Sequence, residues 1–175
     1  MTSGRVYIGV VGPAEPTPAV AAAAEELGAA LARRGHVVVC GGLGGVMAAA
    51  SRGAHEAGGV VVGLLPGTDR GDANPWVTVA LPTGLGELRN GLLVRSCDAV
   101  VAVGGSWGTL SEVALAVRAG IPVVSLGGWR PVPDAAERPG DPDAPFTRGP
   151  GAGPVIAATA LEALAALDQS LARPR

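Results

Sequence analysis

Short apolar runs that alternate with helix-type segments constrain the fold of this chain more than any other feature. The runs are rich in valine, as buried parallel strands often are. Strands alternating with helices form a parallel sheet that carries helices on both faces. The expected fold class is therefore α/β, a single Rossmann-like domain over residues 1–175. We expect strands at 6–11, 37–40, 60–65, 77–80, 99–103, 122–126 and 155–156, and helices at 17–34, 46–57, 85–96, 109–119 and 159–172.

One long segment interrupts the alternation. Residues 127–153 are rich in proline, glycine and aspartate, a composition typical of irregular surface segments. We interpret this segment as a mobile loop or lid within the one domain.

Bulk composition excludes several function classes. With 48% hydrophobic residues and a mean hydropathy of +0.37 the chain has the composition of a folded protein. The apolar runs are too short to cross a membrane, and the first residues lack the pattern of a secretory signal, so we expect a soluble cytoplasmic protein with no membrane partner. A net charge of −2 argues against a nucleic-acid surface.

The basic residues are all arginine. Because the chain has no lysine, it can form no lysine Schiff base with pyridoxal phosphate and has no P-loop lysine, which rejects a pyridoxal-dependent lysine decarboxylase. Cys40 and Cys97 lie in or beside apolar segments and are expected to be buried free thiols. With only His36 and His55 as imidazoles, a zinc cluster is not expected. We expect no metal and no organic cofactor.

Three glycine turns follow expected strands: Gly12-Pro13, residues 41–45 (GGLGG) and residues 104–109 (GGSWGT). Glycine lets backbone amides approach an anion, and the helix that follows adds free N–H groups. Tight packing of strand on helix also requires glycine, but three such turns at the carboxyl edge of one sheet favour a ligand site. We expect a phosphorylated, nucleotide-like ligand. The turns do not match G-x-G-x-x-G, and the strand at 60–65 lacks a terminal acid, which argues against an NAD dehydrogenase.

Longer motifs resemble a known family. Residues 41–47 (GGLGGVM), 58–66 (GGVVVGLLP), Arg89-Asn90 and 104–112 (GGSWGTLSE) are similar to the LONELY GUY (LOG) superfamily, whose members are often mislabelled as lysine decarboxylases. The last run aligns with the family motif P-G-G-x-G-T-x-x-E. Residues 73–76 (ANPW) and 82–90 (PTGLGELRN) look like the branch that includes molybdenum-cofactor carrier proteins and uncharacterised bacterial members.

The resemblance implies a phosphoribohydrolase, which cleaves a nucleoside 5′-monophosphate to the free base and ribose 5-phosphate. Its catalytic arginine and glutamate correspond to Arg89 and Glu112. The alternative is a non-catalytic carrier or sensor for molybdenum cofactor or a signalling nucleotide, favoured by the segment 82–90 and by the first two of three departures from the family pattern. The departures are Gly104 for proline, Ser106 for glycine and Asn90 for lysine. The resemblance also implies a homodimer or higher homo-oligomer, formed through the helices at 85–96 and 109–119.

The expected ligand-binding residues lie in the turns and beside the catalytic pair: Gly12, Gly41, Gly42, Asn90, Gly105, Ser106, Trp107, Gly108 and Thr109. Trp107 could stack on a base or pterin or close over the site.

The catalytic pair also has structural interpretations. Glu112 could form a T-x-x-E capping box with Thr109, or stabilise charge that develops on the ribose. Arg89 could be a surface ion-pair partner, or bind a phosphate or a polarised base.

Overall fold

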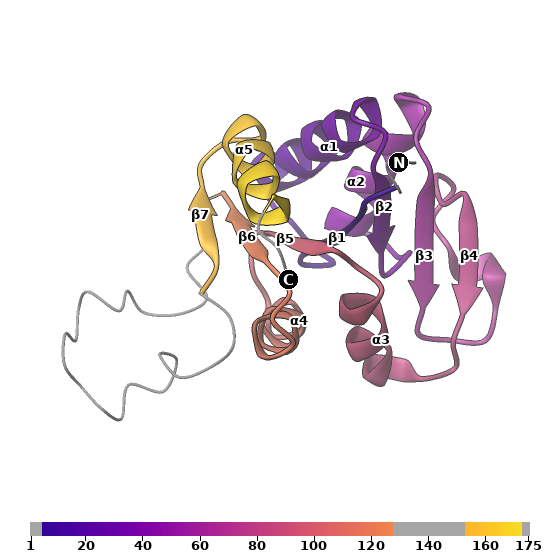
Figure 1. The fold of residues 1–175 in the computed structure, drawn as a ribbon. Helices are drawn as coiled ribbons and strands as arrows, with labels where there is room; N and C mark the ends of the chain where they lie inside the picture. The colour runs from indigo at the N-terminus through magenta and orange to yellow at the C-terminus, as the bar shows by residue number, and fades with distance from the viewer. Residues whose placement is uncertain (1–4, 128–152, 173–175) are drawn as a thin grey trace.

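A seven-stranded parallel sheet forms the centre of the computed structural model, which describes residues 5–127 and 153–172 (Figure 1). The strand order is β4-β3-β2-β1-β5-β6-β7, and all six neighbouring pairs are parallel. The strands are β1 (Tyr7–Val11), β2 (Val37–Cys40), β3 (Val61–Leu65), β4 (Val79–Pro82), β5 (Ala99–Val103), β6 (Val123–Leu126) and β7 (Val155–Ala157).

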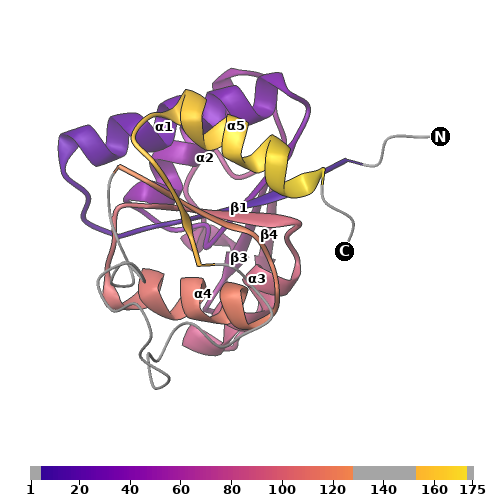
Figure 2. The same cartoon turned by 60° about the vertical axis from the view of Figure 1, so that its left-hand side comes forward.

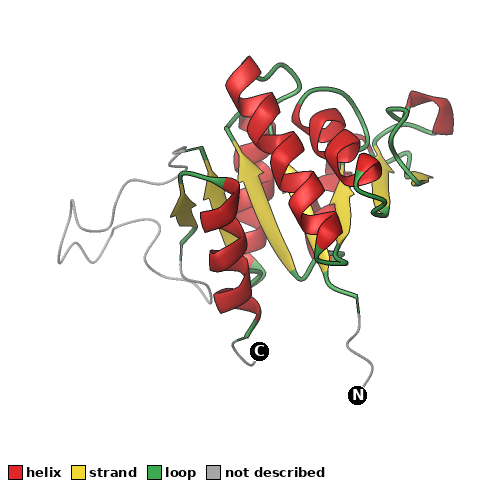
Figure 3. Cartoon of the chain, turned by 90° about the horizontal axis from the view of Figure 1, so that it is seen from above, coloured by secondary structure: helices red, strands yellow, loops and turns green. Residues whose placement is uncertain are grey.

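Helices cover both faces of the sheet. Figure 2 shows α1 (Pro18–Arg33), α2 (Val46–Glu56) and α5 (Ala160–Leu171) on one face, with α3 (Arg89–Arg95) and α4 (Trp107–Arg118) on the other. Figure 3 shows the helices of the first face lying in front of the strands. This arrangement confirms the expected Rossmann-like α/β class. Among the described helices, none is both long enough and apolar enough to traverse a bilayer.

The chain changes direction across the sheet at β1. Strands β2, β3 and β4 extend from one side of β1, and β5, β6 and β7 extend from the other. In doubly wound sheets, ligands bind beyond the carboxyl ends of the strands at such a switch point. The turns after β1, β2 and β5, predicted from their glycines, all lie at this edge.

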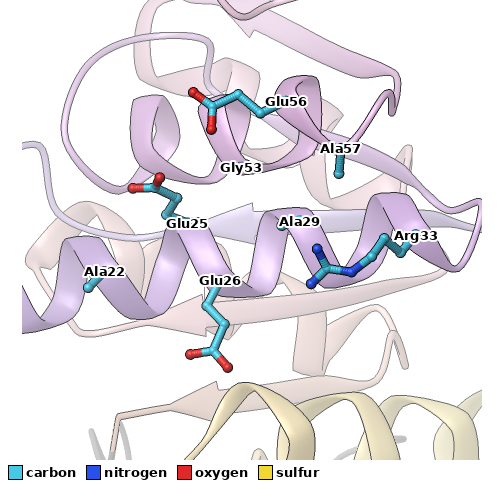
Figure 4. Close-up of a pocket in the computed structure, with 8 residues that line it drawn as sticks. All are labelled: Ala22, Glu25, Glu26, Ala29, Arg33, Gly53, Glu56 and Ala57. Carbon is cyan, nitrogen blue, oxygen red and sulfur yellow. The ribbon is translucent and has the colours of Figure 1, made fainter.

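Close contact between α1 and α2 depends on two glycines. A Cβ added at Gly28 of α1 would lie 2.1 Å from the Ala50 carbonyl oxygen, and one added at Gly53 of α2 would lie 2.0 Å from that of Glu25. Figure 4 shows Gly53 beside the α1 backbone; it lines a surface pocket together with Glu25, Glu26 and Glu56. The backbones of the two helices therefore touch, which no larger side chain at these positions would permit.

Three elements differ from the sequence-based prediction by two residues or more, and the others by one residue at most at either end. The helix expected at 85–96 begins only at Arg89, after a short 3₁₀ turn (Gly86–Leu88), because Gly84 and Gly86 have φ values of +65° and +55°. The helix expected from 109 begins at Trp107 because Ser106 caps it. Strand β4 lies at 79–82, two residues later than expected, because the Val77 N–H donates to the Asn74 carbonyl at 3.2 Å in a turn.

Two further predictions concern the cysteines and the long loop at 127–153. Cys40 and Cys97 are buried free thiols, as expected. Residues 128–152, which make up nearly all of the predicted loop, lie outside the described part of the chain.

Candidate functional site

A pocket of about 320 Å³ opens at the carboxyl edge of the sheet, between the turns after β1, β2 and β5. Its volume is at the lower end of the range for small-molecule sites. The lining comes from segments far apart in the sequence, including the ends of β1 and β3 and the first turns of α3 and α4. Among the lining residues are Gly12, Gly41, Leu43, Met47, Pro66, Glu87, Arg89, Asn90, Ser106, Gly108, Thr109 and Glu112.

The start of α4 carries free main-chain donors, and Gly108 in its first turn lines this pocket. Ser106 is the N-cap: its Oγ accepts a hydrogen bond from the Thr109 N–H at 3.2 Å and lies 2.9 Å from the Thr109 Oγ1. The N–H groups of Trp107 and Gly108 donate to no group in residues 5–127 or 153–172. Free N–H groups and the positive end of the helix dipole attract an anion.

The predicted capping box between Thr109 and Glu112 is wrong, because Ser106 caps α4. Thr109 is the third residue of α4, and its hydroxyl is buried against the Ser106 cap. Ser106 and Thr109 are three residues apart and both are good N-caps, so local sequence could not decide between them. Glu112 is one turn further into the helix, and its carboxylate faces Arg89 instead.

Arg89 and Glu112 form a buried pair that lines the pocket. The Arg89 Nη1 lies 3.6 Å from the Glu112 Oε1, and the residues are only 8% and 7% exposed. This distance is too long for a hydrogen bond. Both Nε and Nη1 of Arg89 are buried and have no hydrogen-bond partner in the described part of the chain. Arg89 is therefore a desolvated cation with donors left for a further acceptor, not a surface ion-pair partner.

The Arg89 guanidinium lies directly against Gly41. A Cβ added at Gly41 would come within 2.4 Å of the Arg89 Nη2 and 2.6 Å of the Met47 sulfur. The first glycine of the 41–45 turn therefore makes room for the arginine, in addition to lining the pocket.

Burial raises the pKa of Glu112 to about 7, although the positive charge of Arg89 acts in the opposite direction. Near neutral pH this carboxyl group is present in both protonation states. It can then accept or donate a proton at the pocket wall, a property that functional carboxyl groups often have.

Asn90 connects the two helices that border the pocket. Its Nδ2 donates to the Ser111 Oγ at 3.0 Å, and that hydroxyl donates to the Gly108 carbonyl at 2.7 Å. Asn90 therefore holds α3 against the first turn of α4, where the resemblance places a lysine in the phosphoribohydrolases.

The structure does not bring every predicted residue into the pocket lining. Gly42 and Gly105 belong to the lining turns but do not line the pocket, and Trp107 is 87% exposed at the start of α4, outside the lining. Sequence reasoning missed Leu43, Met47 and Pro66. Leu43 lies within the glycine turn and Pro66 directly follows β3, so their positions at strand ends were the available signal.

A doubly wound α/β sheet with a glycine-built pocket at its switch point defines a Rossmann-like domain, with the pocket at the edge where such sheets bind ligands. The chain belongs to the SLOG cluster4 family, which it matches over residues 5–143. This membership supports the superfamily to which the motifs pointed.

Similar proteins come from several different organisms. The chain is 41% identical over 121 residues to an uncharacterized protein of Archaeoglobus fulgidus, covering 69% of this chain and 80% of that one. It resembles the molybdenum cofactor carrier protein of Chlamydomonas reinhardtii, with a TM-score of 0.79, 38% identity and coverage of 97% and 100%. It also resembles the molybdenum cofactor binding protein of Rippkaea orientalis, with a TM-score of 0.79, 30% identity and coverage of 96% and 98%.

Proposed function

We propose that this protein binds a phosphorylated small molecule in the switch-point pocket and acts as a carrier of molybdenum cofactor. The observation that carries the proposal is the Arg89 guanidinium, which is buried at the pocket wall with two nitrogens that lack an acceptor. A buried cation whose donors lack acceptors destabilises the folded protein unless an anion binds to those donors.

The residues of the pocket suit such a ligand. Molybdenum cofactor is a pterin that carries a phosphate monoester, and Arg89 and the free N–H group of Gly108 would hold the phosphate. Glu112 would face the polar part of the ligand with a carboxyl group that can accept or donate a hydrogen bond. The cofactor itself is suggested by the two relatives named for binding or carrying it.

Replacing Arg89 with glutamine tests the site. We expect binding to weaken by about 10- to 100-fold, because hydrogen bonds to a charged group contribute about 1.5–3 kcal/mol. Isothermal titration calorimetry would measure the affinity for molybdenum cofactor and for adenosine 5′-monophosphate. Arg118→Gln is the matched control, since Arg118 is an exposed residue in the last turn of α4. Equal affinities of Arg89→Gln and wild type would contradict an anion site at Arg89.

Phosphoribohydrolase activity is the second candidate. The buried pair favours it, because Glu112 is a carboxyl group with a pKa near neutrality beside a fixed cation, as general acid–base chemistry requires. A panel of nucleoside 5′-monophosphates, with released base and ribose 5-phosphate detected by chromatography, tests this activity. If the protein is a hydrolase, Glu112→Gln is expected to abolish turnover and spare binding. Absence of release from every nucleotide, together with binding of molybdenum cofactor, would leave the carrier function.

A homodimer formed through α3 and α4 is also proposed. Leu88 is 81% exposed where α3 begins, and Leu92 and Leu115 are also exposed on these helices. Exposed apolar side chains on adjacent elements are typical of protein–protein contacts. Analytical ultracentrifugation would determine the oligomeric state.

A further inference from the structure

Asn74 holds the 41–45 turn from outside the pocket. It lies in the loop between β3 and β4, and its Nδ2 donates to the carbonyl oxygens of Gly42 at 3.1 Å and Leu43 at 3.0 Å. Its backbone N–H donates to the same Gly42 oxygen at 2.8 Å. The Asn74 Oδ1 accepts a hydrogen bond from the Trp76 N–H at 3.2 Å, so the Nδ2 of the amide is held facing the turn.

The turn needs an external support of this kind. Gly42 and Gly45 have φ values of +74° and +65°, and a glycine-rich segment can adopt many other conformations. Only a specific set of contacts selects the observed one. Asn74 fixes two consecutive carbonyl groups in the middle of the turn, at Gly42 and Leu43, so it determines the orientation of the two peptide planes that follow these residues.

The orientation of those peptide planes determines where their N–H groups point. In a trans peptide the N–H and C=O point in opposite directions. Because the carbonyls of Gly42 and Leu43 face Asn74, the N–H groups of Leu43 and Gly44 point away from it. Within the described residues these two N–H groups have no acceptor. Leu43 lines the pocket and Asn74 does not.

We propose that Asn74 is a positioning residue for ligand binding, which orients the N–H groups of Leu43 and Gly44 as donors to an acceptor oxygen of the bound ligand. This role rests on the proposed function of the pocket. Asn74 itself does not touch the ligand; it acts through the turn. An aspartate would not replace it, because a carboxylate oxygen would then face the two carbonyl oxygens that the amide now binds.

The test compares three variants. Asn74→Ala removes the side-chain donors, and Asn74→Asp replaces them with an acceptor. Thr159→Ala is the stability control. Thr159 is the N-cap of α5 and lies outside the pocket lining; its Oγ1 accepts a hydrogen bond from the Glu162 N–H, which alanine removes. Affinities for molybdenum cofactor and adenosine 5′-monophosphate are measured by calorimetry well below each variant's melting temperature. We expect about tenfold weaker binding for Asn74→Ala, weaker still for Asn74→Asp, and wild-type affinity for Thr159→Ala.

Backbone amide resonances separate positioning from general destabilisation. On addition of whichever of these two ligands the wild type binds, we expect the signals of Leu43, Gly44 and Gly108 to shift. In Asn74→Ala the shift at Gly44 should be lost and that at Leu43 reduced, because the backbone N–H of residue 74 still binds the Gly42 carbonyl, while the shift of Gly108 persists. Wild-type affinity and unchanged Leu43 and Gly44 shifts in Asn74→Ala would overturn the positioning role alone. If the wild-type protein binds neither ligand, the proposed function fails, and the positioning role fails with it.

Discussion

Replacing Gly53 with alanine is expected to destabilise the protein by about 3 kcal/mol, the upper part of the range for overpacked cores. The new Cβ would lie 2.0 Å from the Glu25 carbonyl oxygen and 3.1 Å from the Ala29 nitrogen. Both are backbone atoms of α1, so no side-chain rotation can relieve the clash, and the two helices must separate. For a chain of this size the loss lowers the melting temperature by roughly 6–12 °C. Thermal unfolding followed by circular dichroism would measure it.

Gly91→Ala is the matched control for this change. Gly91 also lies inside a helix, α3, but a Cβ there would meet nothing within 4 Å. Alanine is the better helix former by roughly 0.5–1 kcal/mol, so this variant should be as stable as the wild type or slightly more stable. A Gly53→Ala protein that melts at the wild-type temperature would show that the backbones of α1 and α2 do not make the contact described.

The free energy of unfolding should depend on pH through the titration of the Glu112 carboxyl group. Its pKa is about 7 in the folded protein against 4.5 as the reference for the unfolded chain, so the folded state binds more protons between these values. The free energy of unfolding contributed by this group therefore falls as the pH rises from 4.5 through 7. The loss at higher pH is on the order of 3 kcal/mol. Urea denaturation at a series of pH values between 4.5 and 8.5 would follow it.

Glu112→Gln should remove this component, because glutamine is neutral throughout. The variant is expected to match the wild type near pH 4.5 and to be more stable at pH 8. Glu26→Gln, which changes an exposed carboxylate on α1, controls for the loss of one negative charge. Parallel stability curves for the wild type and Glu112→Gln would contradict a raised pKa at Glu112.

Most of the fold could be predicted because its buried strands are short apolar runs bounded by glycine or polar residues. Strand β5 was predicted with both of its bounds, and β2 likewise. The start of α3 could not be predicted in the same way. Residues 85–88 (LGEL) have a composition that a helix would accept, and only the positive φ values at Gly84 and Gly86 delay the helix to Arg89.

The site could be predicted less completely, since its contacts join distant parts of the chain. Motif resemblance singled out Arg89 and Glu112, but the 3.6 Å approach of their side chains depends on how α3 packs beside α4. The support from Asn74 depends on a loop that folds back beside the 41–45 turn. Trp107 is a large aromatic residue in a glycine turn, which predicts contact with a ligand, yet the cap at Ser106 makes it the exposed first residue of α4.

The donors at the start of α4 belong to the main chain, and this affects how the protein can diverge and how it can be studied. A substitution at Trp107 or Gly108 leaves the backbone N–H group in place, so an alanine scan through this turn would leave those donors intact. Proline is the exception among the natural residues, because it has no N–H to offer, and the first position of a helix tolerates it. Relatives can therefore differ widely in the sequence of this turn while keeping the same main-chain donors.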